Sequence, residues 1–441
     1  MRTMSHGRAP AFSYVIVAAV VAAMAACQPR SGQSGRAGPA MDRISESYVR
    51  LILAMGVHDS SYVDAYYGPA GWRTSVERER PPRAQIRAGA ERLIADLRAA
   101  PGSGDQLEGL RRRFLIEQLT ALLARLDLLE GKRLRFDDES RVLYDAVAPV
   151  VPESRFEAVL ARIDRLVPGT GSLNSRIDEM RAALVIPNDR LDAVFTAAIA
   201  ECRARTVRHI ELPDSERFTV EYVKDKPWGG YNWYQGNYRS IIQVNLDLPV
   251  HIDRAIDLAC HEGYPGHHLQ NVLLEQRLVR GRGWIEFSVV PLYGPMSLIG
   301  EGSSNYGIEL AFPLEERVEF ERRVLYPLAG LDPARAATYA EVNQLLLDLQ
   351  PAINQAARRY IDREIDADAV AAYLTRYGLA RPEFARKMVS FIDANRSYVI
   401  NYNLGRDLVR AWIERQGGGD RRWAAFERLV SSPMTASDIS P

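Results

Sequence analysis

The sequence predicts a mainly α-helical fold with a small antiparallel β-sheet near the middle of the chain. Apolar residues recur at helical spacing from about residue 41 to 210, and again from about residue 249 to 430. Between these stretches, residues 217–248 alternate apolar and polar side chains. The chain has 441 residues, more than one hydrophobic core usually sustains, so we expect two lobes.

The N-terminus has the pattern of a secretory signal. Arg2 and Arg8 precede an apolar run that ends at Cys27. The run Met24-Ala25-Ala26-Cys27 resembles the bacterial lipobox, which predicts lipidation of Cys27, and a plain signal peptide is the alternative. We therefore expect an extracytoplasmic protein, lipid-anchored on the periplasmic side of a bacterial membrane, and Gln28 favours the outer membrane.

A tether and a helical domain follow this signal. Residues 28–42 are rich in Gly, Ser and Pro, which predicts a flexible tether. Residues 43–441 are predicted to form the folded domain. Its clearest helix covers 105–130, where leucines and a phenylalanine recur at helical spacing between arginines and glutamates.

The sheet is predicted at residues 217–248 as three antiparallel strands. Gly236-Asn237 forms a turn between two β-rich runs. The strand from Tyr238 to Leu246 comes directly before the next helix, where an exposed strand would bind an extended peptide by strand addition. A purely structural hairpin is the alternative.

Charge and cysteine content narrow the class of protein. Lys+Arg and Asp+Glu are 56 each, so the formal net charge is zero and no basic face for nucleic acid is expected. Cys202 and Cys260 are the cysteines after Cys27. We favour two buried free thiols, with a disulfide as the alternative.

The segment HEGYPGHHLQ at residues 261–270 holds three of the seven histidines beside one glutamate. It begins like the zinc-peptidase motif H-E-x-x-H, in which two histidines bind zinc and the glutamate acts as general base. Here Pro265 occupies the place of the second histidine. The cluster of ligand-type residues favours a metal site over a structural role, and Glu262 is the predicted general base.

Neither later histidine fits a regular helix. His267 would point about 240° away from His261, and His268 would lie about 10.5 Å further along the axis. Pro265 removes a helical hydrogen bond and Gly266 tolerates unusual backbone angles. These two residues can loop out the extra positions, so the sequence predicts a stretched site in which a later histidine returns towards His261.

The same segment resembles the H-E-x-x-P-G-H-H-L-Q pattern of a bacterial family, domain of unknown function family 885, whose members resemble gluzincin-type zinc metallopeptidases. The stretches at 48–69, "IQVNLDLP", "EGSSNYGIEL" at 301–310 and "YNLGRDLVRAWIE" at 402–414 resemble further family segments. The resemblance implies a large two-lobed helical metallopeptidase-like scaffold, with the sheet preceding the zinc helix and the metal motif within 261–301.

The resemblance also implies the ligands of one Zn²⁺ ion. They are His261, His267 and Glu301. His267 is preferred as the second histidine because related peptidases often carry glycine directly before it, and Gly266-His267 matches this. His268 is the fallback ligand or a residue that orients a ligand. Glu286 and Glu309 are rivals of Glu301. The segment "EGSS" lacks the aromatic residue of the family pattern E-G-W-A.

A late helix supplies further candidates, because Tyr398, Tyr402 and Arg406 recur at i, i+4 and i+8 and would share one face. Tyr402 is the predicted oxyanion donor, with Tyr398 beside it in the substrate-binding set. Arg406 would hold a substrate carboxylate. Gly405 would let a substrate approach the backbone. A solvent-facing surface is the alternative.

Together these features predict a secreted, lipid-anchored zinc metallopeptidase that hydrolyses short peptides, with a peptide as its substrate, no nucleic-acid partner and only the lipid anchor in the membrane. A zinc amidase or deacylase of the cell envelope is one alternative. A non-catalytic metal-binding envelope lipoprotein is another, although such a protein would not need a general base.

Overall fold

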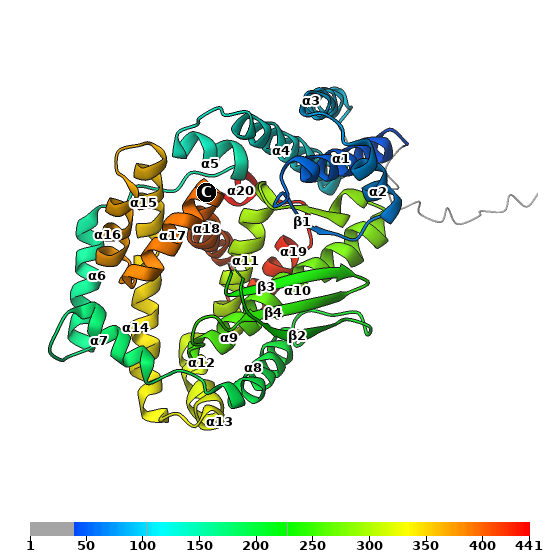
Figure 1. Cartoon of the computed structure of the whole chain (residues 1–441). Helices are drawn as coiled ribbons and strands as arrows, with labels where there is room; N and C mark the ends of the chain where they lie inside the picture. The colour runs from blue at the N-terminus through cyan, green and yellow to red at the C-terminus, as the bar shows by residue number, and fades with distance from the viewer. Residues whose placement is uncertain (1–38, 103, 227) are drawn as a thin grey trace, which may run out of the picture. The chain divides into compact units, whose positions relative to one another are not determined.

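The computed structural model describes residues 39–441 except residues 103 and 227, and this part of the chain is mainly α-helical, as predicted (Figure 1). Its contacts gather it into one compact unit. The predicted signal peptide with Cys27, and most of the predicted tether, lie outside the described residues. Within the described part, no helix combines the length and apolar character needed to cross a membrane.

Helices and one short strand make up the first half of the described chain. The first helix begins at Pro39, slightly before the predicted start of the domain, and the predicted helix at 105–130 is present as Gln106–Leu129. The elements are α1 (Pro39–His58), β1 (Val63–Tyr66), α2 (Ala70–Glu79), α3 (Arg83–Ala99), α4 (Gln106–Leu129), α5 (Phe136–Tyr144), α6 (Glu153–Leu166), α7 (Leu173–Ala182) and α8 (Leu191–Thr206).

Three strands follow, as predicted, but their order makes a mixed sheet rather than an antiparallel one. They are β2 (Arg217–Val223), β3 (Gly230–Gly236) and β4 (Arg239–Asn245). β4 lies between the others, antiparallel to β3 and parallel to β2. Alternation fixes which side chains share a face but carries no information about strand order. The predicted turn at Gly236-Asn237 joins β3 to β4.

The second half is again helical, apart from strand β5 (Val289–Pro291), which pairs with β1. The helices are α9 (Asp253–Leu258), α10 (His267–Leu274), α11 (Pro295–Ala311), α12 (Leu314–Phe320), α13 (Tyr326–Ala329), α14 (Ala336–Leu349), α15 (Pro351–Ile361), α16 (Ala367–Tyr377), α17 (Pro382–Asn395), α18 (Ile400–Gln416), α19 (Asp420–Val430) and α20 (Ala436–Ile439).

Helices α11 and α18 cross in close contact, and this crossing positions the candidate site (Figure 1). A Cβ atom on Gly405 of α18 would lie 2.7 Å from the carbonyl oxygen of Leu298 and 3.1 Å from Cα of Gly302, both in α11. The two glycines therefore let the helix backbones meet without side chains between them. Glu301 precedes Gly302, so the crossing fixes its backbone.

Candidate metal centre

The helix that carries the H-E motif is interrupted between its histidines. α9 continues into a π-helical turn at Ala259–Gly263. Residues 264–266 are not helical, and α10 begins at His267. The Tyr264–Pro265 peptide bond is cis. The π-helical turn and the interruption accommodate the two residues by which this motif is longer than H-E-x-x-H. The presence of Pro265 and Gly266 predicted such a loop.

Gly266 is the residue that closes this break. Its N–H donates to the carbonyl oxygen of Cys260 at 2.9 Å. A Cβ atom at this position would overlap the carbonyl oxygen of His261. The chain therefore folds back tightly enough to bring His267 beside His261 only because residue 266 has no side chain.

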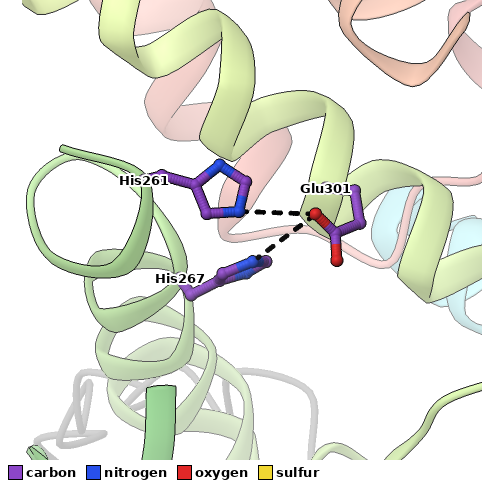
Figure 2. Close-up of side chains that lie close together, drawn as sticks. All are labelled: His261, His267 and Glu301. Carbon is purple, nitrogen blue, oxygen red and sulfur yellow. Dashed lines mark ion pairs between the residues drawn. The ribbon is translucent and has the colours of Figure 1, made fainter. Parts of the chain in front are cut away.

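His261, His267 and Glu301 converge on one point, as Figure 2 shows. Nε2 of His261 lies 3.4 Å from Oε2 of Glu301, and Nε2 of His267 lies 3.9 Å from the same oxygen. The two imidazole rings are nearly perpendicular, at 88°. One ligand atom from each residue lies within 4.8 Å of the other two.

The donor types and their convergence suit a metal ion. Bonds of about 2.0–2.2 Å at tetrahedral angles separate neighbouring ligand atoms by about 3.4 Å. Oε2 of Glu301 is buried and has no hydrogen-bond partner in the described part of the chain. A buried carboxylate oxygen without a partner is costly, and a cation between it and two imidazole nitrogens would satisfy it.

The charges of His267 and Glu301 are consistent with ligand roles. Burial, and then the neighbouring His261, lower the pKa of His267 to about 4, so His267 is neutral at physiological pH. Burial works against the charged form of Glu301, but its contacts with His261, His267 and Tyr398 outweigh burial and lower the pKa of its carboxyl. A neutral imidazole and an ionised carboxylate are the forms that bind metals.

The fallback ligand His268 points away from the triad. Its side chain is fully buried, with Nδ1 2.8 Å from Oγ of Ser240 and Nε2 3.4 Å from Oε2 of Glu216. Tyr264 donates a hydrogen bond to the same glutamate at 2.7 Å. Successive helical residues point about 100° apart, so the side chain of His267 faces the triad while that of His268 contacts Ser240 of the sheet.

The two rivals of Glu301 are engaged elsewhere. Glu286 forms a fully buried ion pair with Arg111. Glu309 pairs with Arg410, whose Nε donates to it at 3.1 Å. Of the three glutamates, only Glu301 faces the histidines.

Glu262 is buried beside the triad without being part of it. Its residue surface is 5% exposed. Burial, together with the negative charges of Glu301 and Asp64, raises the pKa of its carboxyl to about 7, although His261 opposes the shift. A carboxyl that titrates near neutrality can both accept and donate a proton at physiological pH.

The two predicted tyrosines are both near the triad, in different roles. Tyr398 lies in a 3₁₀ turn at Arg396–Val399, and its hydroxyl donates to Oε1 of Glu301 at 3.0 Å. Tyr402 lies in α18 and is 36% exposed, with its ring 5.7 Å from that of Tyr398. Burial of its phenol, and then the charges of Glu301 and Glu262, raise the pKa of Tyr402. Tyr398 thus orients Glu301, whereas Tyr402 packs against Tyr398.

Arg406 and Gly405 do not serve the site as predicted. Arg406 is buried, and its guanidinium donates to Asp407 at 3.0 Å and to Gln350 at 3.4 Å, so it is not available to a substrate carboxylate. Gly405 packs against Gly302 instead of facing a substrate. Tyr398 and Tyr402 do lie side by side, but Arg406, in the same helix as Tyr402, is held by Asp407 and Gln350.

Sequence reasoning missed Asp64 of β1 and the role of Asn232 in β3. The hydroxyl of Tyr231 donates to Asp64, and burial raises the pKa of that aspartate to about 6. Asn232 donates to the main-chain oxygen of Glu262 at 2.7 Å. The available signal was an acidic residue within the aromatic segment "VDAYYGP", and polar residues between the aromatics of "GGYNWY".

The prediction that the strand from Tyr238 to Leu246 would bind a peptide is wrong. β4 contains most of the run from Tyr238 to Leu246, but it is the central strand and both its edges are paired. The strand beside the site is β3, an edge strand of this sheet. Its Gly230 lies so close to Glu262 that a Cβ atom there would be 3.2 Å from Oε1.

The two later cysteines form a disulfide, contrary to the favoured prediction of free thiols. Cys202 of α8 and Cys260 are joined, with their Cα atoms 5.7 Å apart. Both are fully buried. Burial suits free and bonded cysteine equally, so the sequence could not decide between them. The bond attaches the residue before His261 to α8.

Comparison with known proteins gives no assignment. No family model and no curated protein matches the chain, so the resemblance to domain of unknown function family 885 stays an expectation from its motifs. A solved structure described as "the putative lipoprotein from Colwellia psychrerythraea" shares 16% identity over 78% of this chain and 69% of that chain, with a TM-score of 0.49. Another, BsuCP, shares 11% identity over 89% of this chain and 88% of that chain, with a TM-score of 0.43.

Proposed function

We propose that this protein is a zinc-dependent peptidase whose metal is held by His261, His267 and Glu301. The observation that carries the proposal is the convergence of these three donors around a buried carboxylate oxygen that has no hydrogen-bond partner among the described residues. Three protein ligands of this type leave one zinc position for water or substrate, as in catalytic sites. Zinc bound there would polarise a water molecule and the carbonyl group of a substrate.

The chain's own residues would carry the proton transfers. Glu262 accepts a proton from the attacking water as the new C–O bond forms. It then delivers this proton to the leaving amine as the C–N bond breaks. The hydroxyl of Tyr402 donates a hydrogen bond to the carbonyl oxygen as that oxygen gains negative charge. Glu262 coordinates nothing in this scheme, which favours an enzyme over a metal-binding scaffold.

Peptide substrates are favoured by the sheet edge beside the site. β3 is an edge strand, and an extended peptide can pair with such a strand through main-chain hydrogen bonds. Trp228, Tyr231 and Trp233 form a run of ring contacts along this strand, and Trp233 is 43% exposed. These rings would contact substrate side chains.

The test compares matched variants of the two adjacent histidines. We expect about one zinc per chain by metal analysis after zinc-replete purification. His267→Ala should lose the metal, whereas His268→Ala should keep it if the protein folds. Glu262→Gln should keep the metal and lose about 10²- to 10⁴-fold in the rate of hydrolysis of a mixed peptide library.

Three results would count against the proposal. A metal-free protein that hydrolyses peptides at the full rate would exclude the zinc. Loss of metal from His268→Ala alone would shift the ligand by one residue. A Glu262→Gln variant with more than about a hundredth of the original rate would exclude Glu262 as general base.

The proposed location is the bacterial cell envelope, with a lipid anchor at Cys27. The Cys202–Cys260 disulfide supports an oxidising compartment, because such bonds are rare in the cytosol. Cys27→Ser should remove the protein from the membrane fraction or block its maturation. Unchanged fractionation, with no acyl group on the mature N-terminus by mass spectrometry, would refute the anchor.

A further inference from the structure

Glu216 is a buried carboxylate that the proposed reaction does not use. It lies directly before β2, and its side chain is 1% exposed. Both carboxylate oxygens lie 2.7 Å from the hydroxyl of Tyr264. Oε2 also lies 3.4 Å from Nε2 of His268, and Oε1 lies 3.4 Å from Nη2 of Arg203. Burial works against the charged form of Glu216, but these contacts outweigh burial and lower the pKa of its carboxyl, so it is ionised at physiological pH.

Two of these partners lie on either side of the segment that brings the histidines together. Tyr264 is the first residue of the interruption at 264–266, and His268 directly follows the candidate ligand His267. Only residues 265–267 separate the two partners, so fixing both of them on one carboxylate restricts where His267 can lie. Hydrogen bonds to an ionised acceptor are shorter and about twice as strong as neutral ones, which makes Glu216 a firm attachment point.

The side chains of Tyr264 and His268 are also packed against each other and against the sheet. Their rings lie 5.3 Å apart at an angle of 89°. The ring of Phe218 in β2 lies 5.1 Å from each of them. Nδ1 of His268 is 2.8 Å from Oγ of Ser240 in β4. Neither partner of Glu216 can therefore turn away without disturbing the packing of the sheet.

Helix α8 holds both histidine-bearing segments through consecutive residues. Cys202 is bonded to Cys260, which directly precedes His261. The next residue of α8, Arg203, pairs with Glu216. The first histidine is thus attached to α8 by a covalent bond and the second through Glu216, so one helix is the common support for the distance between them.

We infer that Glu216 is a positioning residue: by holding both sides of the interruption, it sets the distance between His261 and His267 and so raises the zinc affinity of the centre. This inference rests on the proposed zinc site and adds a residue that controls its affinity. Glu216 acts through Tyr264 and His268 and is not itself one of the ligands. Replacing residues that orient metal ligands through hydrogen bonds typically lowers metal affinity about 10- to 100-fold.

The experiment compares two buried tyrosines that make the same kind of hydrogen bond. Tyr264→Phe removes the bond to Glu216 and keeps the ring. The matched control is Tyr377→Phe in α16, because the hydroxyl of Tyr377 donates to Glu153 of α6 at 2.8 Å and neither residue belongs to the metal centre. Both variants should unfold at a lower denaturant concentration, since each loses one buried hydrogen bond. Only Tyr264→Phe should bind zinc more weakly, by about 10-fold or more in competition with a chelator.

Two variants of Glu216 test its charge. Glu216→Gln keeps the size of the side chain and should lower zinc affinity about 10- to 100-fold. Glu216→Asp keeps the charge on a shorter side chain and should recover part of that loss. Losses of this size leave the site filled when zinc is in excess. Cobalt(II) in place of zinc adds a spectroscopic measurement, because its visible absorption depends on ligand geometry. At saturating cobalt, the spectrum should change in Glu216→Gln and stay the same in Tyr377→Phe.

These measurements require no turnover, so they separate this inference from the peptidase proposal. Weaker zinc binding in Tyr264→Phe and Glu216→Gln would support the inference even if no peptide is hydrolysed, and Tyr264→Phe decides if Glu216→Gln does not fold. Unchanged zinc affinity in folded Tyr264→Phe would overturn the inference and leave the peptidase proposal intact. So would an equal loss of affinity in Tyr377→Phe, which would make the effect one of stability alone. A protein that binds neither zinc nor cobalt would overturn both.

Discussion

At the scale of single residues, the hydrogen bond from Tyr398 to Glu301 gives the two carboxylate oxygens different contacts. Oε1 accepts from the tyrosine while Oε2 faces the two histidines. A hydrogen bond of this kind fixes the orientation of a metal ligand before the metal binds. Tyr402, four residues later, makes ring contact with Tyr398 but, within the described part of the chain, no hydrogen bond to Glu301.

Substitution of the two tyrosines should therefore have different effects on zinc affinity and on kcat. Tyr398→Phe is expected to weaken zinc affinity about 10- to 100-fold, measured by competition with a chelator. Tyr402→Phe should bind zinc normally and lose about 10²-fold or more in kcat, with little change in KM, because it would donate to the developing oxyanion. Loss of metal from Tyr402→Phe, with normal zinc affinity in Tyr398→Phe, would reverse these assignments.

Sequence reasoning located the residues of the motif, and the family resemblance supplied Glu301, but neither indicated Asp64 or the role of Asn232. His261, His267 and Glu262 are neighbours in sequence, and their spacing with Pro265 and Gly266 limits the ways in which they can meet. Asp64 meets Tyr231 only because β1 lies near β3, which no local pattern encodes. Arg406 was misplaced because helical spacing does not reveal that Asp407 and Gln350 bind its guanidinium.

At the scale of elements, the crossing of α11 and α18 holds Glu301 opposite the histidines. The backbones meet at Gly302 and Gly405. Gly405→Ala would press a methyl group against the carbonyl of Leu298, so we expect a loss of about 1–3 kcal/mol in the free energy of unfolding, measured by denaturant titration. Zinc affinity should fall with it, because α11 carries Glu301.

The matched control is Gly71→Ala in α2. A Cβ atom there meets nothing within 4 Å, so alanine should be neutral or stabilising by up to about 1 kcal/mol. If both variants unfold at the same denaturant concentration, the close crossing does not contribute to stability.

Also at the scale of elements, the alternation of apolar and polar residues predicts strands but not their order in the sheet. The alternation of 217–248 correctly predicted three strands and the turn at Gly236-Asn237. It could not predict that β4 inserts between β2 and β3, because strand order depends on which edges meet in three dimensions. The error bears on the proposed function, since the candidate peptide-binding strand was placed at β4, which is central, whereas β3 is an edge strand.

At the scale of the whole molecule, the Cys202–Cys260 disulfide closes a loop that contains the entire sheet and ends beside His261. The two cysteines are 58 residues apart, for which loop-closure entropy gives about 4 kcal/mol of stabilisation. The double variant Cys202→Ala, Cys260→Ala should be less stable by about that amount in denaturant titration. A reducing agent should destabilise the original protein once it reaches the buried bond, but not the double variant. Equal stability of the two proteins would contradict the estimate.

The break before His267 has a consequence for the recognition of other proteins. A search string written for an uninterrupted helix, H-E-x-x-H, passes over this chain although two histidines and a glutamate converge within it. The string that the geometry dictates is H-E-x-x-x-G-H. Its glycine is obligatory because any side chain at residue 266 would overlap the carbonyl oxygen of His261, whereas the residues before it make no such demand through this contact. Sequences that satisfy this longer string, followed by a glutamate on a later helix, are the ones in which a comparable centre is to be sought.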